Sequence, residues 1–134
     1  NYGFLRKLQI ESLDAARKSG ASPYATLVIY DESLFSLTRL WVLDRHFFYE
    51  GWPIISATDY FDLLEKQGQN YFHSLGFKKL YAIFPTAEVL RNAKVEYPEA
   101  AALLRQNLID RRAEIRKIIA PSGKEAFYIY SAGL

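Results

Sequence analysis

The run Lys79-Leu-Tyr-Ala-Ile-Phe84, which stops at Pro85, is the clearest strand in this sequence. Three further β-rich runs share its apolar and aromatic character: Tyr24-Ala-Thr-Leu-Val-Ile-Tyr30, Trp52-Pro-Ile-Ile-Ser56 and Ala126-Phe-Tyr-Ile-Tyr-Ser131. Helical patterns of roughly ten to twenty residues separate these runs, which is the spacing of βαβ units. We therefore expect a three-layer α/β/α sandwich on a four-stranded, mainly parallel sheet. The last strand could be an antiparallel edge.

Residues 32–50 allow two interpretations. Leu34, Leu37, Trp41 and Phe48 recur at helical spacing after Asp31, and this favours a helix over Glu32–Glu50. The continuous apolar run from Leu40 to Leu43 also fits a strand, because periodicity alone does not separate a short buried strand from a buried helix. In that alternative, residues 37–43 form a hairpin with the first strand.

Three other helices follow from apolar periodicity and from helix-ending signals. The first covers Phe4–Ser19. The second begins at Ser56, where Ser56-Ala-Thr-Asp59 has the form of a capping box, and runs to Gly76 with a kink expected at Gly68. The longest covers Glu99–Ile119 after Pro98, and a short helix begins at Thr86. The buried stripe of the longest helix comprises Ala101, Leu104, Leu108, Ile115 and Ile118.

Length and composition predict a single domain over residues 1–134, aromatic-rich and soluble. Half of the residues are hydrophobic and 16% are aromatic, which excludes an intrinsically disordered segment. The chain has no cysteine, so disulfides and thiolate metal sites are excluded, and no methionine, so we expect a piece of a longer chain. The longest uncharged stretch, Ser19–Tyr30, is too short to span a bilayer. The cytoplasm is favoured over other compartments.

Acidic residues mark the carboxyl ends of the expected strands, where ligands bind in open α/β sheets. Asp31, Glu32, Asp59 and Glu88 could together hold a divalent cation for phosphoester chemistry. Each also lies at an expected helix start, where capping alone accounts for a carboxylate, and capping is favoured. No Gly-x-Gly pair occurs, so classical dinucleotide and phosphate-binding loops are excluded. No residue can be assigned a catalytic role, and no cofactor is expected.

Two groups of residues are candidates for partner binding. Arg105, Arg112 and Arg116, at spacings of seven and four, would share one face of the longest helix. That face could meet an acidic protein or, with weaker support, nucleic acid; its alternative is an ordinary solvated surface. The second group is aromatic and comprises Phe47, Phe48, Tyr49 and Trp52. These side chains could anchor a partner or belong to the core.

Part of the chain resembles the central region of the GCN5-related acyltransferases. The similar residues are Thr38-Arg-Leu-Trp-Val42, the helix end Ser74-Leu-Gly-Phe77 and the strand Leu80-Tyr-Ala-Ile-Phe84. The family grips the pyrophosphate of acyl-CoA with a glycine-containing loop. The corresponding segment here, Arg45–Pro53, has one glycine and a proline. The resemblance implies an acyl-CoA-binding domain.

The sequence leaves open whether the domain is an enzyme. The favoured interpretation is a non-catalytic interaction or regulatory module that binds another protein or another domain of the same chain. The alternatives are a metal-dependent nuclease or phosphatase with acidic residues at the strand ends, and an acyltransferase-like domain.

Overall fold

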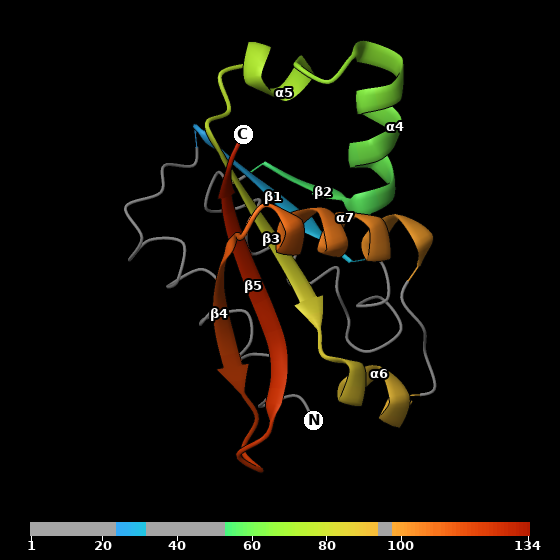
Figure 1. Ribbon diagram of the computed structural model, residues 1–134, viewed down its shortest axis with the longest axis vertical. Helices are drawn as coiled ribbons and strands as arrows, with labels where there is room; N and C mark the ends of the chain where they lie inside the picture. Colours follow the sequence, from blue (N-terminus) through green and yellow to red (C-terminus); the bar gives the residue numbers. More distant parts are fainter. Residues whose placement is uncertain (1–23, 32–52, 94–97) are drawn as a thin grey trace.

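The computed structural model describes residues 24–31, 53–93 and 98–134 (Figure 1). The described elements are, in chain order, β1 (Thr26–Tyr30), β2 (Ile54–Ser56), α4 (Ala57–Gln67), α5 (Tyr71–Ser74), β3 (Lys79–Pro85), α6 (Ala87–Ala93), α7 (Glu99–Asp110), β4 (Glu114–Ile119) and β5 (Glu125–Gly133). The fold is mixed α/β. The expected helices over Phe4–Ser19 and Glu32–Glu50, and the alternative hairpin strand over residues 37–43, lie outside the described residues.

The strands form a five-stranded mixed sheet in the order β2-β1-β3-β5-β4. β1 pairs in parallel with β2 and β3, whereas β5 is antiparallel to β3 and β4 is antiparallel to β5. The expectation of a four-stranded, mainly parallel sheet was wrong in its strand count and in the place of the last strand. β5 is antiparallel, as the sequence allowed, but it lies inside the sheet, and β4 occupies the end of the described strand order.

One face of the sheet carries the hydrophobic core beneath α4, α5 and α7. Because side chains alternate along a strand, Leu27 and Ile29 of β1 share this face with Leu80, Ala82 and Phe84 of β3. Tyr130 of β5 joins them, and its ring meets that of Phe84 edge-on at 5.4 Å. The helices contribute Ala57, Tyr60, Leu64, Phe72, Ala101, Leu104 and Leu108 to the same cluster.

The opposite face is also buried. Val28, Tyr81, Ile83, Phe127 and Ile129 are each at most 5% exposed. Burial of both faces explains why β1 and β3 read as nearly continuous apolar runs. The helices α4, α5 and α7 lie on one face of the sheet. The third layer stays a prediction.

The helix after β2 begins and breaks where its sequence indicates. The Ser56 hydroxyl accepts a hydrogen bond from the Asp59 amide at 3.0 Å, which caps α4. The helix ends at Gly68, whose φ of 97° is unfavourable for other residues. The chain resumes as the short helix α5. The kink expected at Gly68 is therefore confirmed as a complete break.

The expected helix over Glu99–Ile119 was wrong in its second half. The α7 helix stops at Asp110, and residues Glu114–Ile119 form β4 instead. Two hydrogen bonds close the helix end: the Ala113 amide donates to the Leu108 carbonyl and the Arg112 amide donates to the Ile109 carbonyl, each at 3.0 Å. This pair defines a Schellman motif with Arg112 at the position that glycine usually occupies.

Within the described residues, no helix is both long and apolar enough to cross a membrane.

Candidate ligand-binding site

The predicted acidic residues at the carboxyl ends of the strands lie in separate structural interactions. Asp31 follows β1, is fully buried, and its amide donates to the Ile83 carbonyl at 3.2 Å. Asp59 is exposed in the first turn of α4. Glu88, in the first turn of α6, accepts a hydrogen bond at 2.8 Å from the Lys124 ammonium. Of these three carboxylates, that of Glu88 has a described ion-pair partner, Lys124, on the turn between β4 and β5.

These carboxylates do not form a metal centre in the part of the chain that the structure describes. No group of three or more histidine, aspartate or glutamate side chains there is placed to hold a metal ion. Glu32, the fourth predicted ligand, lies outside the described residues. The metal site therefore stays a prediction.

The three predicted partner-binding arginines do not share a helix face, because the helix that would align them ends early. Arg105 is half-buried on α7, Arg112 lies in the turn after it, and Arg116 is exposed on β4. The prediction that the three arginines share a helix face was wrong. A role in partner binding stays a prediction for each arginine. The aromatic candidates Phe47, Phe48, Tyr49 and Trp52 lie outside the described residues.

A positively charged hollow lies at the opposite end of the parallel strands, near the start of β3 and the end of β5. We call it the cationic pocket. Its volume is about 310 Å³, within the range of ligand sites. Three cations and one carboxylate are among its described lining residues, which are Lys79, Arg111, Arg112, Ala113, Glu114, Ser131, Ala132 and Gly133.

The turn that ends α7 supplies the two arginines of this pocket. The Arg111 amide donates to the Asn107 carbonyl at 3.0 Å, and its guanidinium donates to the Gly133 carbonyl at the end of β5. Arg112 adopts a φ of 55°, in the left-handed region that costs residues other than glycine roughly 1–2 kcal/mol. The leucine and alanine at either end of the turn, Leu108 and Ala113, contact the core.

Lys79 reaches the cationic pocket from β3. It is half-buried, and its ammonium lies 5.9 Å from the centroid of the Tyr81 ring, which is within cation–π range. In the sheet, Lys79 pairs with Gly133, and Glu114 pairs with Ser131. The two sheet pairings therefore bring cations from a strand and from a helix end to one corner of the sheet.

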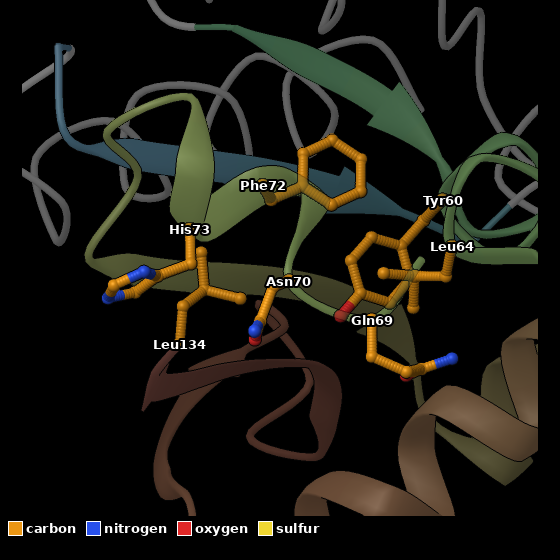
Figure 2. Close-up of a pocket in the computed structure, with 7 residues that line it drawn as sticks. All are labelled: Tyr60, Leu64, Gln69, Asn70, Phe72, His73 and Leu134. Atoms are coloured by element: carbon orange, nitrogen blue, oxygen red, sulfur yellow. The ribbon is translucent and has the colours of Figure 1, made fainter. Parts of the chain in front are cut away.

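A second hollow, which we call the aromatic pocket, lies between α4, α5 and the chain end (Figure 2). Its volume is about 340 Å³. Tyr60 and Phe72 are buried there, and their rings stack at 5.2 Å with an interplanar angle of 18°. Its described lining residues are Tyr60, Leu64, Gln69, Asn70, Phe72, His73 and Leu134.

Adjacent residues at the end of β5 line the two pockets. Burial raises the pKa of the Tyr60 hydroxyl, and the positive charge of Arg111 partly opposes this rise. Gly133 lines the cationic pocket and its neighbour Leu134 lines the aromatic pocket. The Leu134 amide donates to the Lys78 carbonyl at 3.0 Å, which holds this chain end beside β3. Gly133 and Leu134 thus line one pocket each.

Sequence reasoning missed Lys79, and it missed the end of the sheet at which Lys79 and Arg111 come together. The one available signal was the pair Arg111-Arg112 after an apolar helical stripe. Without a glycine or proline there, the helical pattern has no recognised stop signal. Comparison with protein-family models, with curated proteins and with solved structures found no match to this chain.

Proposed function

We propose that this domain is a non-catalytic binding module that holds an anionic group of its partner in the cationic pocket. The observation that carries the proposal is the conformation of Arg112. At the residue after a helix C-cap, glycine adopts the left-handed region without steric cost, whereas arginine does not. Arg112 occupies that position with a φ of 55° and lines the pocket. Residues held in such conformations cluster at functional sites.

The chemistry of the described lining supports an oxyanion as the ligand. A guanidinium group presents its N–H donors in a planar fork that matches carboxylate and phosphate oxygens. The Arg111 guanidinium is already held by the Gly133 carbonyl, so little further ordering is needed when an anion arrives. Lys79 adds a third cation, and Glu114 offsets one of the three charges. An anion would relieve the repulsion among these cations.

The decisive experiment is the substitution Arg112→Gly. We expect it to raise the free energy of unfolding by about 1 kcal/mol, because glycine removes the left-handed strain. We expect the affinity for inorganic phosphate to fall about tenfold, because a charge-assisted contact is lost. Urea denaturation measures the first effect, and NMR titration of the backbone amides measures the second.

Lys66→Ala is the matched control, because Lys66 is an exposed cation in the last turn of α4 and does not line the pocket. It removes one charge of the same sign, so it corrects for the general field of the protein. Phosphate affinity that is equal in wild type, Arg112→Gly and Arg111→Ala would contradict the proposal. If Arg112→Gly increased the free energy of unfolding but left the phosphate affinity unchanged, the strained conformation of Arg112 would have no role in binding.

The other functional hypotheses stay predictions. The metal-dependent phosphoesterase depends on Glu32, and the acyltransferase-like loop depends on Arg45–Pro53; both lie largely outside the described residues. The partner under the present proposal is another protein, another domain or a charged ligand that bears an oxyanion. Since the cations are fixed by β3, α7 and β5, the proposal does not depend on the segments outside the described residues.

A further inference from the structure

We infer that the partner is a phosphorylated peptide segment, which adds as an extended strand to the outer edge of β4 and places its phosphate in the cationic pocket. This inference rests on the proposed function and names its partner class. It starts from the continuity of the two features, because Glu114 lines the pocket and is also the first residue of β4. A strand that lies along β4 therefore passes directly beside the pocket.

The outer edge of β4 has the geometry that a further strand needs. Among the described strands, β4 lies at the end of the sheet, beside β5 (Figure 1). Proteins discourage pairing at such an edge with lysines, prolines or bulges. Residues 114–118 contain no proline, and the register of β4 shifts only after Ile118. The ammonium of Lys117 is held by Glu125 of β5 at 2.8 Å, so it is directed to the neighbouring strand of the same sheet.

The two faces of β4 offer a peptide different contacts. Ile115 pairs with Tyr130, so it lies on the face of the sheet that carries α4, α5 and α7. It is nevertheless 50% exposed. Glu114 and Arg116 lie on the opposite face, and both are exposed. A peptide strand beside β4 would meet an apolar side chain on one face and charged side chains, next to the pocket, on the other.

The net charge of the cationic pocket favours a phosphate over a carboxylate. Its three cations and one carboxylate leave a net charge of +2 among the described lining residues. A phosphorylated side chain carries about −1.5 to −2 at pH 7 and presents three acceptor oxygens, whereas a carboxylate carries about −1. The two guanidinium groups can each bind such oxygens in pairs. Arg116, on the same face as Glu114, favours acidic residues beside the phosphate.

A second copy of this chain fits the same edge less well. Each β4 strand carries Glu114, Arg116 and Lys117, a net charge of +1, and would bring that charge beside a pocket that is already positive. Like charges on neighbouring strands are destabilising. We therefore favour a phosphorylated peptide, and self-association becomes an outcome of the test.

The test measures, by calorimetry on the whole chain, the affinity of the acetylated peptide Val-Glu-Val-pSer-Val-Glu-Val. Its sequence reads the same in both directions, so the test does not depend on whether the added strand is parallel or antiparallel to β4. We expect it to bind about tenfold more tightly than free phosphoserine, because strand addition contributes main-chain hydrogen bonds. We expect the unphosphorylated peptide to bind about tenfold more weakly than the phosphorylated one, because the charge-assisted contacts are lost.

N-methylation of the peptide distinguishes strand addition from a general attraction between charges. Alternate residues of a strand direct their N–H groups to the same neighbouring strand. One peptide is therefore methylated at the nitrogens of its two inner valines, and a second at those of its two glutamates. We expect one of the two to lose about tenfold in affinity and the other to bind like the unmodified peptide, because only one set of N–H groups faces β4.

The matching change in the protein is Ile115→Thr, which keeps a β-branched residue on the strand but removes apolar surface. We expect it to reduce the affinity for the phosphorylated peptide about threefold, because a cross-strand apolar contact is lost. The affinity for phosphoserine should not change. Leu103→Thr is the control, because Leu103 is 56% exposed on α7 and lies outside β4 and the cationic pocket.

The outcomes separate this inference from the proposed function. If the phosphorylated peptide bound no more tightly than phosphoserine, or if both methylated peptides bound equally, strand addition would be overturned and the anion site would stand. A peptide with glutamate in place of phosphoserine that bound equally well would overturn the assignment of phosphate. Dimerisation through β4, shown by sedimentation and abolished by Ile115→Thr, would also overturn the inference. Absence of binding by inorganic phosphate, phosphoserine and every peptide would overturn both the inference and the proposed function.

Discussion

The two ends of the parallel strands β1, β2 and β3 differ in how their polar groups are used. At the carboxyl end, the Ser56 hydroxyl caps α4, the Thr86 hydroxyl donates to the Glu125 carbonyl at 3.1 Å, and Glu88 pairs with Lys124. At the amino end, Lys79, Arg111 and Arg112 line an open hollow. The general rule for open α/β sheets places the ligand at the carboxyl end. In the described part of this chain, the cationic pocket lies at the other end.

The difference follows from the antiparallel strands added to the sheet. β5 runs opposite to β3, so its carboxyl end lies beside the amino end of β3. The chain enters β4 from α7 at this same corner, which brings Arg111 and Arg112 to it. At the other corner, the turn between β4 and β5 lies beside α6, and Lys124 bridges the two. The antiparallel strands of this mixed sheet therefore place the end of β5 and the charged turn before β4 at the amino ends of the parallel strands.

The largest predicted effect comes from truncating Leu108, a buried leucine of the core beside the amino-end corner. Leu108 is fully buried and its carbonyl accepts the hydrogen bond that closes the Schellman motif. We expect Leu108→Ala to lower the free energy of unfolding by about 2–5 kcal/mol, as buried leucine truncations do. Leu103 on the same helix is 56% exposed, so Leu103→Ala should change the free energy of unfolding by less than about 0.5 kcal/mol. Urea denaturation of both variants checks the contrast.

Equal losses in the two leucine variants would contradict the assignment of Leu108 to the core and of Leu103 to the surface. The same experiment bears on the site. If phosphate affinity in Leu108→Ala falls even under conditions where the variant is folded, the arginine turn depends on that packing. This dependence is expected because Leu108 and Ala113 anchor the two ends of the turn that carries Arg112.

A smaller effect is predicted at the carboxyl-end corner. Ser56→Ala removes the hydroxyl that accepts from the Asp59 amide, and we expect a loss of about 1 kcal/mol in the free energy of unfolding. Phosphate affinity should not change, since Ser56 caps α4 and does not line the cationic pocket. Ser56→Asn is the control, because asparagine is an equally good N-cap and should restore most of the stability. A change in phosphate affinity in Ser56→Ala would contradict the conclusion that anion binding belongs to the amino ends of the parallel strands alone.

The strands were predictable because each is a short, dense apolar run. β3 was expected at Lys79–Phe84 and observed at Lys79–Pro85, and β5 was expected at Ala126–Ser131 and observed at Glu125–Gly133. β4 was not predictable in the same way. Ile115 and Ile118 continue the helical spacing of Leu104 and Leu108, so the pattern read as one long helix. On β4 the alternation is weak, because five of its six residues are exposed.

The missed helix end and the missed site have the same physical origin. Had residue 112 been a glycine, the sequence would have shown the end of α7, and β4 would have followed from it. Arg112 stands where a glycine would have marked the helix end, and it is also one of the three cations of the cationic pocket. Lys79 and Gly133 come together through the β3–β5 register, which no local pattern encodes. Capping at Ser56, by contrast, is local, and the sequence predicted it correctly.

The smallest predicted effect is a pH dependence at the carboxyl-end corner. Hydrogen bonds from Lys117 and from the Tyr128 hydroxyl hold the pKa of Glu125 below its usual value of about 4.3. Because the folded-state pKa is the lower one, the stabilisation is fully present above the unfolded value. It is lost as the pH falls through the folded value. The effect is small, since both side chains are substantially exposed and screened by water.

A double-mutant cycle isolates this contribution. The variants are Glu125→Gln, Lys117→Ala and their combination, compared by urea denaturation at pH 7 and at about pH 3, below the usual pKa of glutamate. We expect a small favourable coupling at pH 7 that declines toward zero at the lower pH, because protonation removes the charge that Lys117 contacts. In that case the charge of Lys117 is neutralised by Glu125, a carboxylate of the same β4–β5 hairpin. Arg111 and Arg112, by contrast, line an open pocket. A coupling of the same size at both pH values would show that the contact between Lys117 and Glu125 is steric and not electrostatic. The comparison of the two corners would then depend on the charges of the cationic pocket alone.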